Sequence, residues 1–121
     1  MKVNTLDLEI FKDLLEFNVE EIYYDLHNDF DCLNLNFEND TLVLTLKGIN
    51  SSMLYVKFRN VELTLFNFSE NSNISTIDSL YRGKFEIDNK LVESKDKLGY
   101  IYLEFYDGVK LEFWAESIEI Q

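Results

Sequence analysis

Apolar residues near the start of the chain recur every three or four positions, which is the spacing of one face of an α-helix. The residues at this spacing are Leu6, Ile10, Leu14 and Phe17, with Leu8, Phe11 and Leu15 beside them. Asn4 or Thr5 is a suitable N-cap, because a short polar side chain there accepts a hydrogen bond from the first turn. The pattern predicts an amphipathic helix over residues 5–17.

From about residue 20 onward apolar and polar positions alternate, which is typical of half-buried β-strands. Two strands are predicted over residues 30–38 and 41–47, joined by a turn at Asn39-Asp40. The residues expected on the buried face are Leu33, Leu35 and Phe37 in the first strand and Leu42, Leu44 and Leu46 in the second. Most of the chain is therefore expected to form antiparallel sheet.

The alternation changes phase within residues 53–68. The apolar residues before the change are Leu54, Val56 and Phe58, and those after it are Val61, Leu63 and Leu65. A bulge or tight bend near Asn60 would keep both halves on the core, because one extra residue reverses the faces of a strand.

A polar loop is predicted over residues 69–76. Ile77, Leu80 and Tyr81 then indicate a short helical turn, and Gly83 is suited to end it. The alternating pattern resumes after this turn.

The register of the last hairpin, that is, which residues of its two strands lie opposite one another, follows from the sequence. A three-residue loop over 106–108, with Gly108 in a left-handed conformation, places apolar residues opposite one another, whereas a two-residue turn sets them against a charge. The predicted pairs are Phe105 with Val109, Leu103 with Leu111, Ile101 with Phe113, Glu104 with Lys110, Tyr102 with Glu112, and Tyr100 with Trp114. The phase changes again after Ala115, so another bulge is predicted near Glu116-Ser117.

Together these elements predict an α+β fold, in which an N-terminal amphipathic helix is followed by a mainly antiparallel β meander closed by a C-terminal hairpin. Residues 1–121 are expected to form one domain, because no linker or repeat divides them. An apolar fraction of 46% and an aromatic fraction of 15% exclude a disordered acidic tail.

Charge narrows the choice of partners. The net charge is −12, and nine of these charges fall within the first forty residues, where eleven acidic residues face two lysines. Such a field repels phosphate and attracts basic groups. A basic protein is therefore the expected partner, and direct binding to nucleic acid or to an anionic membrane is disfavoured. Arg59 and Lys57 are interpreted as counter-ions for neighbouring acids.

The chain is expected to act in the cytoplasm. Its single cysteine, Cys32, has no partner for an internal disulfide, and acids interrupt the apolar run that a signal peptide requires. No stretch approaches the length of about 18 apolar residues that spans a bilayer.

Candidate chemistry centres on the one histidine. Asp25, His27, Asp29 and Asp31 alternate, so an extended backbone would direct all four side chains the same way. A metal site is the less favoured interpretation, since Asn28-Asp29 is also a turn signal. A thiolate–imidazole pair of Cys32 with His27 is disfavoured by the negative field. No cofactor or metal is predicted, and the protein is not expected to be an enzyme.

A partner surface is predicted instead. The last hairpin combines aromatic and acidic residues on one face, a composition suited to docking basic side chains, although packing of its aromatic residues inside the protein is an equal alternative. The predicted partner-binding residues are Glu20, Glu21, Asp25, His27, Asp29, Asp31, Tyr100, Tyr102, Glu104, Glu112 and Trp114.

The order of these features resembles a known class. A Leu26-His27-Asn28-Asp29 turn ahead of a strand, followed by a meander and the closing segment FYDGVKLEFWAESIEI, is similar to small acidic immunity-type proteins encoded beside polymorphic bacterial toxins. Several groups of them carry a Leu-His-Asp-Ser-like turn, and this chain has Asn28 where that turn has Asp. The likeness covers residues 20–121. It implies stoichiometric binding that blocks a toxin, without chemistry of its own.

Two alternatives remain open. The first is a phage-type nucleic-acid mimic that inhibits a restriction or CRISPR-type complex, with carboxylates spaced like phosphates. The second is a small metal-dependent enzyme around His27. A mimic should present acids in long exposed rows, whereas an immunity-type protein combines acids with aromatic anchors.

Overall fold

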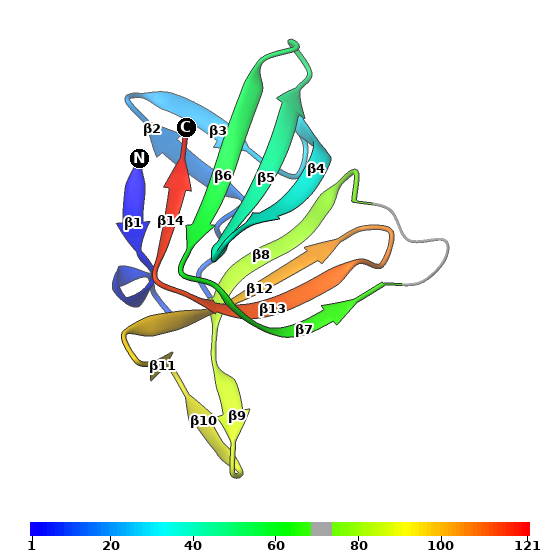
Figure 1. Cartoon of the computed structure of the whole chain (residues 1–121). Helices are drawn as coiled ribbons and strands as arrows, with labels where there is room; N and C mark the ends of the chain where they lie inside the picture. The colour runs from blue at the N-terminus through cyan, green and yellow to red at the C-terminus, as the bar shows by residue number, and fades with distance from the viewer. Residues whose placement is uncertain (69–73) are drawn as a thin grey trace.

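The computed structural model describes residues 1–68 and 74–121, and in this part the chain consists almost entirely of antiparallel β-strands (Figure 1). Two larger sheets pack against each other, and two short hairpins lie at their margins. Of the polar loop predicted over residues 69–76, positions 69–73 lie outside the described residues. No helix in the described part has the length and apolar character needed to cross a membrane.

The first sheet has the strand order β1-β14-β6-β5-β4. Its strands are β1 (Lys2–Asn4), β14 (Ser117–Ile120), β6 (Met53–Arg59), β5 (Thr41–Gly48) and β4 (Phe30–Glu38). As predicted, β4 and β5 form a hairpin with its turn at Asn39-Asp40, and Asn39 has a left-handed φ of 58°. The two ends of the chain meet in this sheet, where β1 pairs with β14.

The second sheet has the order β11-β12-β13-β7, and β8 also pairs with β12. Its strands are β11 (Ser94–Lys95), β12 (Leu98–Phe105), β13 (Lys110–Ala115), β7 (Glu62–Asn67) and β8 (Ile77–Gly83). The β12–β13 hairpin has the predicted register from Tyr100–Trp114 to Glu104–Lys110. Gly108 has a φ of 103°, which is the left-handed conformation that the three-residue loop requires.

The two marginal hairpins project from this framework (Figure 1). One is formed by β2 (Glu16–Val19) and β3 (Ile22–Asp25), and the other by β9 (Phe85–Ile87) and β10 (Lys90–Val92). The β2–β3 turn consists of Glu20 and Glu21, whose φ angles of 51° and 69° are both left-handed. This pair of angles is typical of the tight turns that suit the twist of a hairpin.

Two strand pairs bend from one sheet into the other. The chain passes from β6 to β7 through Asn60, which has a φ of 54°, and from β13 to β14 through Glu116. The two bends lie side by side, since the N–H of Glu116 donates to the carbonyl of Arg59 at 2.9 Å. The tight bend predicted near Asn60 is therefore confirmed, whereas the bulge predicted near Glu116-Ser117 is instead a bend from one sheet into the other. The two bends form one corner of the molecule (Figure 1).

The main core lies between the two sheets. Leu42, Leu44 and Leu46 of β5 are fully buried, as predicted, and Phe58 of β6 meets Phe113 of β13 edge to face at 5.0 Å between ring centres. Each fully buried side chain of this size contributes about 1.5–3 kcal/mol to folding. The core therefore depends on inward-facing residues of both sheets.

The predicted fold class is wrong, because the N-terminal helix is absent. Thr5–Asp7 forms a short 3-10 turn, η1, and the rest of residues 5–17 is extended or irregular before β2. Leu14 donates its backbone N–H to the carbonyl of Leu80 at 2.8 Å, and Phe11 likewise donates to Arg82, so this segment pairs with β8. Backbone groups used in this way are not available to a helix, and tertiary pairing outweighs the local periodicity.

The predicted helical turn around residues 77–83 is also wrong, because this segment is strand β8. Gly83 belongs to the strand for a steric reason: a Cβ there would lie 2.1 Å from Cε2 of Tyr102. The missing side chain makes room for the Tyr102 ring, and the glycine does not end a helix.

Four residues predicted on the core face are exposed instead, among them Phe37 near the end of β4 with an exposed fraction of 40%. Leu33 is the extra residue of a bulge between Cys32 and Asn34, and its exposed fraction is 55%. Leu63 and Leu65 lie on β7, an edge strand with a register shift opposite Glu112 and Phe113, and their exposed fractions are 42% and 37%. Each bulge changes which side chains face inward, and the sequence alternation does not reveal it.

A buried arginine joins the N-terminal segment to the second sheet. The Arg82 guanidinium donates to the backbone carbonyls of Thr5, Gly83 and Glu93, with 3.0 Å from Nε to the Thr5 oxygen. The side chain has no carboxylate partner among the described residues. Burial lowers the pKa of Arg82, yet a guanidinium remains protonated at neutral pH. Its hydrogen bonds to these carbonyls, together with the nearby negative charge of Glu93, compensate the buried charge.

Thr5 completes this polar centre. Its hydroxyl donates to the carbonyl of Ala115 and accepts the N–H of Gly99 at 3.0 Å. A Cβ on Gly99 would lie 2.7 Å from Nε of Arg82 and 2.8 Å from Oγ1 of Thr5, so only glycine fits there. We call Thr5, Arg82 and Gly99 the polar hub.

We expect Arg82→Met to lower the free energy of unfolding by about 2–5 kcal/mol, because three buried carbonyls lose their donor. Urea denaturation measures this change. Lys84→Met is the matched control: Lys84 forms a partly exposed ion pair with Glu93 at 3.5 Å, and its loss should cost less than about 1 kcal/mol. Equal unfolding midpoints for the two variants would contradict the role of the hub.

We expect Gly83→Ala to destabilise the protein by about 1–3 kcal/mol, because the new methyl group overlaps the Tyr102 ring. In a Tyr102→Ala background the same change should cost less than half as much, since the obstructing ring is gone. A thermal or urea double-mutant cycle measures the difference. The same cost in both backgrounds would show that the strain lies elsewhere.

Candidate partner-binding site

The aromatic face of the last hairpin is internal. Tyr100 and Trp114 are fully buried in a second, smaller core, where Phe85 of the β9–β10 hairpin covers them with ring-centre distances of 4.9 and 5.8 Å. This face was expected either to dock a partner or to pack inside the protein. For Tyr100 and Trp114 the structure shows that they pack inside. They offer no surface to a partner.

The other predicted residues of this face differ in exposure. Tyr102 is half-buried, stacks on Tyr81 at 4.8 Å and donates its hydroxyl to the carbonyl of Lys84 at 3.0 Å. Glu112 is half-buried and accepts the Tyr100 hydroxyl at 3.2 Å, whereas Glu104 is exposed. Burial is the main cause that raises the pKa of Tyr100. These contacts are those of a stabilised sheet surface rather than of an open site.

The turn that carries the histidine is held by Asp25. One carboxylate oxygen of this buried residue accepts the backbone N–H groups of His27 and Asn28, both at 3.0 Å, and the other accepts the Asn28 side chain at 2.8 Å. The Asn28 side chain is the main reason that the pKa of Asp25 lies below its usual value. Nδ1 of His27 lies 2.6 Å from the carbonyl of Ile77, so this nitrogen carries the proton.

The alternating acids around His27 do not converge. Asp25 serves the turn, Asp29 lies half-buried beside Phe30, and Asp31 is exposed on β4. Within residues 1–68 and 74–121, no group of three or more His, Cys, Asp or Glu side chains is placed to hold a metal ion. Cys32 is buried, which raises the pKa of its thiol to about 11. The metal-enzyme alternative therefore finds no ligand set among the described residues.

An acidic hollow of about 240 Å³ opens beside His27. Four carboxylates line it, those of Asp13, Glu16, Asp25 and Asp78, and its described lining includes no lysine or arginine. Only Asp25 and His27 were predicted as site residues. Asp13 and Glu16 were assigned to the helix, and Asp78 lies far away in the sequence, so no local pattern indicates that these acids meet.

A second hollow of about 160 Å³ continues the first, because the two share Asp13, Leu15 and Asp78. Phe11 stands at its far end with an exposed fraction of 65% and its ring centre 6.3 Å from that of Tyr81. The φ of Phe11 is 64°, an unusual angle for a bulky residue and one that its pairing with Arg82 maintains. We call the two hollows together the acidic groove.

Tyr23 supplies an exposed aromatic ring next to the groove. Its hydroxyl donates to Oε1 of Glu16 at 2.6 Å, and this hydrogen bond is the main cause that raises the pKa of Tyr23 to about 12. The exposed fraction of Tyr23 is 54%, and the predicted residues Glu20 and Glu21 are exposed in the adjacent turn. Phe11 thus lines the groove, and Tyr23 lies next to it through its contact with Glu16.

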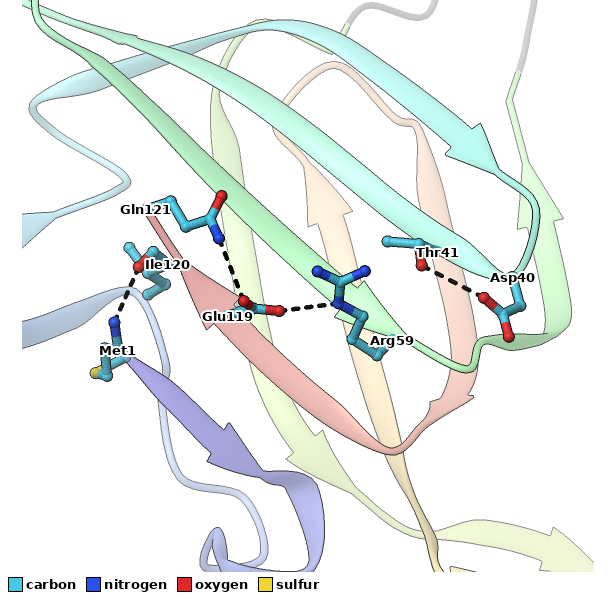
Figure 2. A network of polar contacts seen from close by, with 7 residues as sticks. All are labelled: Met1, Asp40, Thr41, Arg59, Glu119, Ile120 and Gln121. Atoms are coloured by element: carbon cyan, nitrogen blue, oxygen red, sulfur yellow. Dashed lines mark hydrogen bonds and ion pairs between the residues drawn. The ribbon is translucent and has the colours of Figure 1, made fainter.

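The acids of the first forty residues are free of ion pairs in the described structure. The salt bridges found there join Arg59 to Glu119, Lys84 to Glu93, Lys95 to Glu62, and Lys110 to Glu112. Figure 2 shows the Arg59 pair, in which Nε lies 2.9 Å from the Glu119 carboxylate, so Arg59 is a counter-ion as predicted. In the same view the Asp40 carboxylate accepts the Thr41 hydroxyl at 3.4 Å.

Comparisons with known proteins add no identity. No family model matches the chain, and neither the search of characterised proteins nor that of solved structures finds a match. The resemblance to immunity-type proteins therefore stays a hypothesis.

We expect Glu16→Gln to lower the pKa of Tyr23 from about 12 toward its ordinary value near 10, because the charged acceptor is removed. Ultraviolet titration of the phenol measures this shift, with Tyr23→Phe identifying the Tyr23 component. Since the raised pKa favours the neutral phenol in the folded state, its contribution to stability is present below pH 10 and is lost as the pH rises through 12. Glu20→Gln is the control, and an equal shift there would contradict the specific contact.

Proposed function

We propose that this chain is a non-catalytic binding protein whose acidic groove receives lysine or arginine side chains of a basic protein. The observation that carries the proposal is the composition of the groove: its described lining has four carboxylates and no lysine or arginine, and the exposed rings of Phe11 and Tyr23 lie beside it. Carboxylates bind guanidinium and ammonium groups through charge-assisted hydrogen bonds, and aromatic faces attract the same cations.

The groove is prepared for such a ligand. The Asp13 carboxylate is fixed by the backbone N–H of Leu15 at 2.7 Å, Glu16 by the Tyr23 hydroxyl, and Asp25 by the His27–Asn28 turn. Carboxylates held in place lose little conformational freedom when a cation binds, and this increases affinity. The surrounding negative charge accelerates the encounter with a basic partner.

Within this class, an immunity-type inhibitor that blocks a basic toxin or nuclease by stoichiometric binding is the function we favour. Enzymes that cut nucleic acid need a basic surface around the active site, and an acidic groove competes for it with phosphate. The mixture of acids with aromatic rings supports this choice over a nucleic-acid mimic, which needs acids in long exposed rows. The cytoplasm is the proposed place of action.

We expect immobilised wild-type protein to capture a basic protein from a lysate of its source at low salt and to release it at high salt. A groove variant carrying Asp13→Asn, Glu16→Gln and Asp78→Asn should bind that protein about 100-fold more weakly, since each lost charged contact costs roughly 1 kcal/mol or more. Purified partner and surface plasmon resonance give the two affinities.

The control variant carries Glu38→Gln, Asp40→Asn and Asp107→Asn, which remove the same charge from exposed positions outside the groove. It should keep its affinity within about threefold, because distant exposed charges are screened by salt. If both variants bound the partner equally weakly, the affinity would depend on net charge alone and not on the acidic groove. Capture without inhibition of the partner's activity at a one-to-one ratio would contradict the inhibitor function.

A further inference from the structure

A larger apolar hollow lies on the other side of the segment that forms the acidic groove. It has a volume of about 400 Å³ between β1, β14 and residues 8–18. Its apolar lining consists of Met1, Val3, Leu8, Leu14, Phe17, Ile118 and Ile120. We call it the apolar groove.

The two grooves share a wall. Asp13 and Glu16 line both of them, whereas Leu14 faces the apolar groove and Leu15 the acidic groove. Residues 13–16 therefore form a ridge between the two. The ridge is fixed from both sides, because Leu14 donates its N–H to the carbonyl of Leu80 and Leu15 accepts the N–H of Leu26, both at 2.8 Å.

We propose that one segment of the basic partner straddles this ridge, with a lysine or arginine in the acidic groove and a large apolar side chain in the apolar groove. This inference rests on the proposed function and specifies the chemistry that the partner must present. The apolar anchor supplies affinity, and the cation supplies orientation and rate.

Charge complementarity selects this occupant. The carboxylates of Asp13 and Glu16 stand on the wall of the apolar groove, where the described lining also holds Lys12 and the N-terminal ammonium of Met1. The four carboxylates of the adjoining acidic groove would repel an anionic amphiphile that extends across the ridge, and a second copy of this chain would be repelled by the net charge of −12. An apolar side chain next to a cation avoids this repulsion, and by excluding water it strengthens the attraction between that cation and the wall.

Three peptides of equal length, capped at both ends, test the inference on isotope-labelled protein. The first carries leucine two positions from arginine, so that in an extended chain both side chains point the same way. The second has serine in place of the leucine, and the third has citrulline, an uncharged analogue, in place of the arginine. NMR titration measures each affinity and maps each footprint.

The leucine–arginine peptide should bind about tenfold more tightly than the serine–arginine peptide, equivalent to about 1.4 kcal/mol. It should shift the amide signals of Leu8, Leu14 and Ile118 in addition to those around His27 and Asp78. The serine–arginine peptide should shift only the second set. Val3→Phe, which fills the apolar groove, should abolish the tenfold gain, while Val19→Phe, a half-buried position outside that groove, should retain it.

The outcomes separate the two proposals. Equal affinity of the leucine–arginine and serine–arginine peptides, or unmoved signals in the apolar groove, would overturn the straddled ridge and leave the proposed function standing. Equal affinity of the arginine and citrulline peptides, or no binding by any of the three, would overturn both. The footprints come from the wild-type protein, so the inference is tested even where Val3→Phe does not fold.

Discussion

The buried guanidinium of Arg82 is the contact on which the rest of the structure depends. It lies where three segments meet and donates to one carbonyl from each: η1, the end of β8, and the loop before β11. Burying an unpaired cation is costly, and charge-assisted hydrogen bonds together with the negative field of a chain of charge −12 offset that cost. The acidic N-terminal segment is fixed to the second sheet through this centre.

That attachment explains the shape of the acidic groove. Because Thr5 is held at the polar hub and Leu14 pairs with Leu80, residues 8–16 must run along the edge of β8. Asp13 is thereby brought next to Asp78, sixty-five positions further along the chain. The same pairing covers an edge of the sheet that would otherwise be open to association, so one segment protects the edge and carries acids to the surface.

Local rules were enough for the turns of the β4–β5 and β12–β13 hairpins, and insufficient for the N-terminal segment and for the β2–β3 and β9–β10 hairpins. The register of β12 and β13 followed from alternation and from the conformation of Gly108, and the bends at Asn60 and Glu116 followed from changes of phase. Residues 5–17 satisfied a helical pattern, yet their partners on β8 lie far away in sequence. Bulges such as that at Leu33 leave no local signal, and the meeting of Asp13 with Asp78 depends on tertiary pairing alone.

The acidic groove keeps four carboxylates close together, those of Asp13, Glu16, Asp25 and Asp78. Hydrogen bonds hold the first three in place. Such an arrangement is stable only because the polar hub and the two-sheet core hold the backbone beneath it. A bound lysine or arginine therefore meets carboxylates whose positions are already set, and ordering these side chains takes little from the free energy of binding.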